Sequence, residues 1–93
     1  MSKQSRGKSW LDFRLADRIA LDGREYTVEL VARRGTGVPG FRMTVVYIPR
    51  EGGADTVVEL PNAASTADVH RVARELSGDV ARLESLFADT RVA

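Results

Sequence analysis

The dipeptide Asp22-Gly23 constrains the fold of this chain more than any other feature of its sequence. A two-residue hairpin loop of type I′ needs positive φ at both positions, which Asp-Gly tolerates, and it joins two antiparallel strands directly. Before this dipeptide, apolar residues occupy alternate positions from Leu11 to Leu21, with Asp17 as the single exception. A period of two is typical of a strand with one buried face, so the sequence predicts a β-hairpin here.

A helix is the competing interpretation of the segment before the turn, because Leu11, Leu15 and Ile19 are also four residues apart. The register favours the hairpin, since it gathers the apolar residues of both strands on one face, and a slip of one residue would destroy that agreement. The predicted cross-strand pairs are Leu21 with Arg24, Ile19 with Tyr26, Asp17 with Val28, Leu15 with Leu30 and Phe13 with Ala32.

Two more strands are expected after the hairpin. The segment from Phe41 to Ile48 is apolar on both faces in its second half, which is typical of a central strand or of one whose outer face is covered. Pro49 ends it, because proline cannot donate a hydrogen bond to a neighbouring strand. After a glycine-containing loop, Thr56 to Leu60 predicts a short fourth strand.

The last segment predicts a long amphipathic helix from Thr66 to about Ala88, with Ser65 as its N-cap. Its apolar residues recur at separations of three and four, and this stripe keeps its phase across Gly78. We therefore expect one helix that tolerates the glycine at a cost of about 1 kcal/mol relative to alanine. Two shorter helices broken at Ser77-Gly78 are the alternative.

Together these elements predict an α+β fold in the order ββββα, a four-stranded antiparallel sheet with one long C-terminal helix packed across one face. Residues 1–8 carry Lys3, Arg6 and Lys8 and no acid, so we expect a flexible basic tail. Residues 9–93 then form a single domain, since the chain is too short for two cores. The element order is similar to that of some single-stranded DNA-binding and transcription-cofactor proteins, a likeness of topology alone.

The predicted helix would be about 35 Å long, whereas an eight-residue strand spans about 27 Å. We therefore expect the helix to extend past the sheet and to leave its distal apolar residues uncovered. Two apolar residues on the outer face of the third strand should also lack cover within one chain. A second copy of the chain would cover them, which predicts a homodimer. The predicted dimer or partner interface comprises Val46, Ile48, Leu83, Leu86 and Phe87.

Composition argues against several functions. The chain has no cysteine, which excludes disulfides, thiolate metal sites and cysteine nucleophiles. It has no apolar run long enough to cross a membrane and no apolar segment after its N-terminus, so we expect a soluble, cytoplasmic protein without membrane partners. The single histidine, His70, would need an orienting carboxylate and a nucleophile for catalysis; Asp68 and Ser65 are close in sequence, but Ser65 is better explained as the helix cap. We expect no catalytic residue, no metal and no cofactor, with catalysis by His70 as the remaining alternative.

The connection between the second and third strands has the glycine spacing G-x-G-x-x-G at Gly35, Gly37 and Gly40. In dinucleotide-binding loops such glycines lead into a helix whose N-terminus meets the pyrophosphate. Here they lead into a strand, and Pro39 removes one N–H group. We therefore interpret the segment as a bend, beside which Arg33 and Arg34 could still contact a phosphate.

The formal net charge of +1 conceals an uneven distribution. Residues 13–50 hold seven arginines against four acids, whereas residues 51–93 hold four arginines against eight acids. Guanidinium groups suit phosphates because they donate two parallel hydrogen bonds, although a solvated face of mixed charge is the alternative. Trp10 is the one aromatic side chain expected to be free to stack on a base. The predicted nucleic-acid-binding residues are Arg14, Arg18, Arg33, Arg34 and Arg42.

These observations favour a small, non-catalytic, regulatory protein that forms a homodimer and binds DNA or RNA through arginines on one sheet face and beside the glycine-rich loop. The alternative is a protein-interaction subunit that docks on a protein partner through its exposed apolar strand or helix end. The sequence identifies no ligand.

Overall fold

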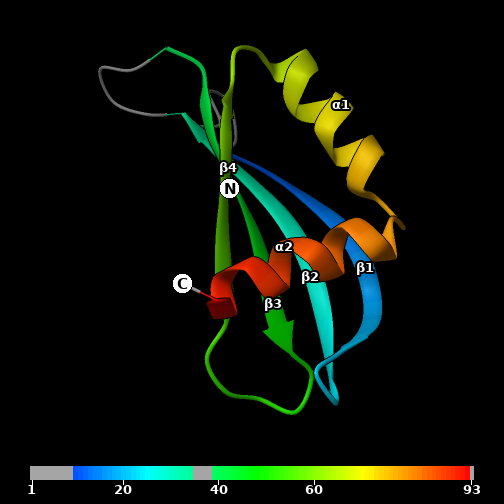
Figure 1. Ribbon diagram of the computed structural model, residues 1–93. Helices are drawn as coiled ribbons and strands as arrows, with labels where there is room; N and C mark the ends of the chain where they lie inside the picture. The colour runs from blue at the N-terminus through cyan, green and yellow to red at the C-terminus, as the bar shows by residue number, and fades with distance from the viewer. Residues whose placement is uncertain (1–9, 35–38, 93) are drawn as a thin grey trace, which may run out of the picture.

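The computed structural model describes residues 10–34 and 39–92 and contains one four-stranded sheet and two helices (Figure 1). The strands lie in chain order and every neighbouring pair is antiparallel, so the predicted α+β class and its sheet are confirmed. The predicted basic tail, residues 1–8, lies outside the described residues. The elements are β1 (Trp10–Leu21), β2 (Arg24–Arg34), β3 (Phe41–Pro49), β4 (Thr56–Ala63), α1 (Thr66–Leu76) and α2 (Val80–Val92).

The turn between β1 and β2 has the predicted geometry, with φ of 55° at Asp22 and 81° at Gly23. Next to the turn the register is also as predicted, since Leu21 lies opposite Arg24 and Ile19 opposite Tyr26.

Farther from the turn the predicted register is wrong, because β1 contains two irregularities, one between Arg14 and Ala16 and one between Ala16 and Ile19. Each adds one residue to β1. The two shifts sum to two residues, so the alternation returns to its original face and the apolar residues of β1 still point to the core. Asp17, which broke the alternation in the sequence, lies with Arg18 at the second irregularity, where both side chains are exposed. In place of the predicted Asp17–Val28, Leu15–Leu30 and Phe13–Ala32, the observed pairs are Ala16–Val28, Phe13–Leu30 and Leu11–Ala32.

The prediction of a single long helix is wrong, and the structure instead has the alternative, two helices separated by a break at Ser77-Gly78. The N–H of Ser77 donates to the carbonyl of Ala73 at 2.9 Å, and Gly78 adopts a φ of 75°, a left-handed conformation common after a helix C-terminus. Asp79 then accepts a hydrogen bond from the N–H of Arg82 at 3.2 Å, as an N-cap does. The helical layer therefore changes direction, and α2 crosses the sheet instead of extending past it (Figure 1).

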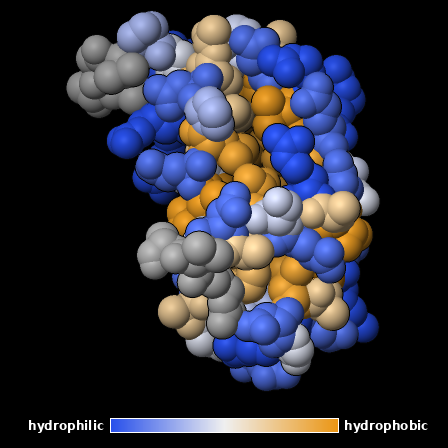
Figure 2. Space-filling model, in the orientation of Figure 1, coloured by the Kyte–Doolittle hydropathy of each residue, from blue (hydrophilic) through white to orange (hydrophobic). Residues whose placement is uncertain are grey.

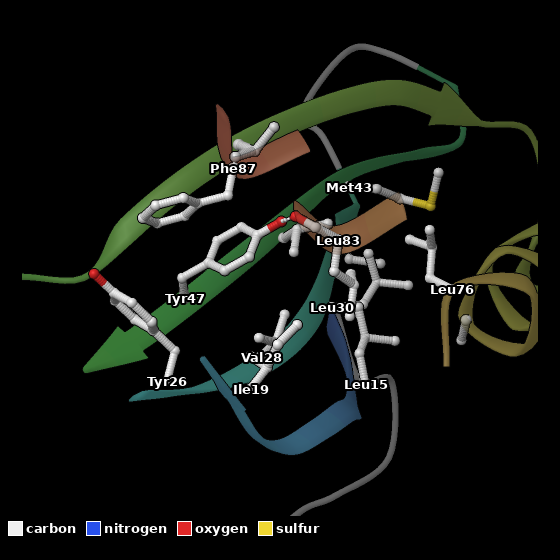
Figure 3. Packing of buried hydrophobic residues seen from close by; sticks show 14 of the residues in the cluster. Leu15, Ile19, Tyr26, Val28, Leu30, Met43, Tyr47, Leu76, Leu83 and Phe87 are labelled. Carbon is white, nitrogen blue, oxygen red and sulfur yellow. Dashed lines mark hydrogen bonds between the residues drawn. The ribbon is translucent and has the colours of Figure 1, made fainter. Parts of the chain in front are cut away.

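The core lies between the two helices and one face of the sheet (Figure 3). The hydroxyl of Tyr47 on β3 donates a buried hydrogen bond of 2.8 Å to the carbonyl of Leu83 on α2. The ring of Phe87 lies 5.0 Å from that of Tyr47 and 5.2 Å from that of Tyr26, measured between centroids. These contacts fix α2 across the centre of the sheet. Within the described residues, neither helix has the length and apolar character needed to cross a membrane.

Candidate functional site

The sheet face turned away from the helices, here called the outer face, carries most of the predicted binding residues. Paired residues of neighbouring antiparallel strands point to the same side, so the outer face consists of rows that cross the strands. We call its first row, Trp10, Arg33 and Arg42, the basic row. The next two rows are Asp12, Val31, Thr44 and Glu59, and Arg14, Glu29, Val46 and Val57.

Two of the predicted arginines on this sheet are paired with carboxylates. Arg14 donates to Asp17 at 2.6 Å and lies 3.5 Å from Glu29. The hydrogen bond with Asp17 raises the pKa of the Arg14 guanidinium, which stays charged. Arg18 lies 3.6 Å from Glu25. These pairs make this part of the outer face nearly neutral, so it attracts an anion less than the sequence suggested.

The basic row differs from the rest of the outer face because it contains two arginines and no acid. Arg33 and Arg42 are direct cross-strand neighbours, and like charges in that position repel each other. Arg42 has a long contact of 3.7 Å with Glu59, whereas Arg33 forms no ion pair with any described residue. The guanidinium carbon of Arg33 lies 6.0 Å from the ring centre of Trp10, which is 51% exposed. A bound anion would relieve this repulsion.

Arg34 lies at the same end of the sheet but points to the opposite face, because side chains alternate along a strand. Its guanidinium carbon lies 5.0 Å from the ring centre of Phe41. The structure therefore brings Arg33 together with Arg42 and places Arg34 apart from them.

An apolar hollow of about 330 Å³ adjoins the basic row on the outer face. Val46 and Val57 are cross-strand neighbours within it, and Val57 is 53% exposed. Val57 was not among the predicted site residues, although it alternates with buried Val58 in β4 and so had to point outward. The hollow is lined by Val31, Thr44, Val46 and Val57 together with Arg33, Arg42 and Glu59. Because Arg33 and Arg42 belong to the adjoining basic row and Glu59 to the edge strand β4, we call these three charged residues its rim.

The predicted interface residues lie in different environments. Leu83 and Phe87 are buried in the chain's own core, because α2 folds back over the sheet. Leu86 is partly buried against that core. Val46 and Ile48 are half-buried on the outer face, as their positions in β3 predicted. Only these last two therefore contribute to an uncovered sheet surface.

A second concave region, here called the α1–β4 groove, lies on the helical side and encloses about 340 Å³. Its apolar lining includes Met43, Leu60, Val72 and Leu76, and its rim carries charges of both signs. Figure 2 shows apolar surface between the charged residues of α1 and the region of β4. The sequence did not predict this groove, because it depends on α1 standing at an angle to the strands.

Two other sequence features have structural explanations. Gly40 has a φ of 84°, and a Cβ atom there would collide with the carbonyl oxygen of Ala63, so this glycine permits close approach of β3 and β4. Gly35 and Gly37 lie outside the described residues. His70 is exposed, and its ring lies nearly perpendicular to that of Phe13, with 5.0 Å between the ring centroids. Across residues 10–34 and 39–92, no group of three metal-ligating side chains comes together.

Comparisons of this chain with protein-family models, with curated proteins and with solved structures find no match. Its function must therefore be argued from its own surfaces. The basic row of the outer face brings two arginines beside an exposed indole and an apolar hollow, whereas the α1–β4 groove combines apolar lining with balanced charge.

Proposed function

We propose that this protein binds nucleic acid through the basic row and acts as a non-catalytic regulatory protein in the cytoplasm. The observation that carries the proposal is the opposition of Arg33 and Arg42 on neighbouring strands, with no ion pair to Arg33 among the described residues. Such an arrangement costs stability in the free protein and becomes favourable when an anion lies between the two guanidinium groups.

The sequence adds positive charge next to this row. Residues 1–8 contain three basic side chains and no acid, and the chain joins them to Trp10 through Ser9 alone. Contacts to phosphate supply most of the affinity of proteins that bind nucleic acid without sequence preference. An exposed indole beside guanidinium groups is also a surface on which a base can stack.

The test is fluorescence polarisation with labelled oligonucleotides at about 50 mM salt, where electrostatic binding is strong. Replacing both Arg33 and Arg42 by alanine should weaken binding at least tenfold and make affinity less dependent on salt, since two phosphate contacts are lost. The matched control replaces Arg74 and Arg82, exposed arginines of the helical layer, and should bind nearly as the natural chain does. Absence of binding to every oligonucleotide at low salt would falsify the proposal.

A protein-interaction subunit is the second candidate, favoured by the α1–β4 groove. The groove is apolar with a rim of both charges, which suits the apolar face of an amphipathic helix from another protein. This candidate becomes the stronger one if the purified chain is a monomer by light scattering and binds no oligonucleotide.

The homodimer remains a proposal for the outer face, where Val46 and Ile48 are half-buried without cover from the helices. A dimer formed there would cover the surface that we assign to nucleic acid. Light scattering with and without oligonucleotide separates the two uses, because a dimer through this face should dissociate when the oligonucleotide binds.

A further inference from the structure

We infer that the nucleic acid bound at the outer face is single-stranded and that one of its unpaired bases lies in the apolar hollow next to the basic row. This inference rests on the proposed function and specifies its ligand. It starts from the contrast between the lining of the hollow and its rim. Two arginines and a glutamate form the rim, and three valines from three strands, with Thr44, make up the rest of the lining.

The apolar lining favours a base over a phosphate. Val31, Val46 and Val57 present no hydrogen-bond donors, so a phosphate placed on them would lose its hydration without compensation. The face of a base is apolar and gains from contact with such a surface.

The basic row provides the complementary place for the phosphates. Arg33 and Arg42 line one side of the hollow, so a nucleotide with its base on the valines has its phosphate within reach of the two guanidinium groups. Trp10 lies next to Arg33 in the same row and offers its exposed ring to a neighbouring base. The outer face therefore separates surfaces for bases from a surface for phosphates.

A duplex does not use these features. Its base faces are stacked inside the helix, and only base edges and the sugar–phosphate backbone are accessible in the grooves. The exposed side of α1 is the helical surface that could enter a groove. There Arg71 is paired with Asp68 at 3.3 Å and with Glu75 at 3.6 Å, and with Arg74 the four charges sum to zero, so that surface has no net positive charge.

The experiment compares three ligands of equal length by fluorescence polarisation at about 50 mM salt. These are a labelled single strand, the same strand in a duplex, and a strand of abasic sugar–phosphate. We expect the single strand to bind at least tenfold more tightly than either of the others. The fluorescence of Trp10, the only tryptophan in the chain, should be quenched by the single strand and not by the abasic one.

The decisive variant is Val57→Lys, since it adds positive charge to the outer face while filling the hollow. If the site holds only phosphates, this variant should bind more tightly. If a base occupies the hollow, it should bind the single strand several-fold more weakly. The matched control is Val80→Lys on α2, because Val80 is 48% exposed and Val57 is 53% exposed. Thermal unfolding of both variants confirms that each is folded.

Each outcome decides one of the two ideas. Equal affinity for the single strand, the duplex and the abasic strand overturns the inference and leaves the proposed function intact. Tighter binding by Val57→Lys also overturns the inference. Failure of all three ligands to bind the natural chain removes the proposed function, and the inference with it.

Discussion

The two faces of the sheet differ in the burial and charge of their side chains. On the helix-covered face, Val28, Leu30, Val45 and Tyr47 are fully buried, and Tyr47 satisfies its hydroxyl inside the protein. On the outer face, valines lie among charged residues, and two arginines oppose each other across neighbouring strands. The covered face gains stability from burial, whereas the opposed arginines of the basic row repel each other. A surface whose charges repel each other in the free protein is where a ligand should be sought.

The largest expected effect tests the covered face. Leu83 is completely buried between α2 and the sheet, so Leu83→Ala should lower the free energy of unfolding by about 2–5 kcal/mol. The outer-face counterpart Val57→Ala should change it by less than about 1 kcal/mol, because that side chain is half exposed. Urea unfolding of both variants measures the contrast. Similar losses, with stability that rises with protein concentration, would mean that a second copy covers the outer face.

The next effect concerns the buried tyrosine. Burial raises the pKa of Tyr47 to about 12, whereas an exposed tyrosine in the unfolded chain has a pKa of about 10. The folded state therefore holds this proton more tightly. The stabilisation is complete below pH 10 and is lost as the pH rises from 10 to 12, by up to about 1.4 kcal/mol per pH unit.

Tyr47→Phe is the control for this pH dependence. It should lower stability at neutral pH by about 1–3 kcal/mol, because the carbonyl of Leu83 loses its buried donor. It should also remove part of the decrease in stability above pH 10. Urea unfolding midpoints at pH 8, 10 and 11 measure both effects. An equal alkaline decrease in the variant and the natural chain would show that another group is responsible.

The smallest effect tests the basic row itself. Arg33→Thr removes one of two opposed positive charges and introduces a residue that favours strands. We expect stability to rise by about 0.5 kcal/mol while oligonucleotide affinity falls. Thermal unfolding and polarisation on the same samples measure the two changes. A loss of stability would show that Arg33 contributes packing, through Trp10, that exceeds the repulsion.

The fold could be read from the sequence where local chemistry is decisive. Asp22 and Gly23 fixed the hairpin because few residue pairs accept positive φ at two successive positions. The bulges in β1 could not be read, because the alternation resumes in phase after two single-residue insertions. The helix break was present in the sequence only as the alternative at Ser77-Gly78, because glycine is common just after a helix end. The continuous apolar stripe outweighed that signal, although Val80, a member of the stripe, is 48% exposed.

The candidate site was only partly predictable. Strand positions placed Arg14, Arg33 and Arg42 on one face, but the carboxylates that pair with Arg14 depend on the bulged register and on side-chain reach. The separation of Arg33 from Arg34 follows from strand alternation and was available from the sequence. The hollow could not be predicted from the sequence. Val31, Val46 and Val57 lie on three different strands and become neighbours only once the register of all three strands is known.

The irregularities of β1 also affect whether an edge of this sheet can pair with the sheet edge of another molecule. β1 and β4 are the outermost strands, so each leaves a line of backbone donors and acceptors open to another molecule. The two bulges and the exposed charges of Asp17 and Arg18 interrupt that line in β1, and Pro61 interrupts it in β4 by lacking an N–H group. Pairing of either sheet edge with the sheet edge of another molecule is therefore disfavoured.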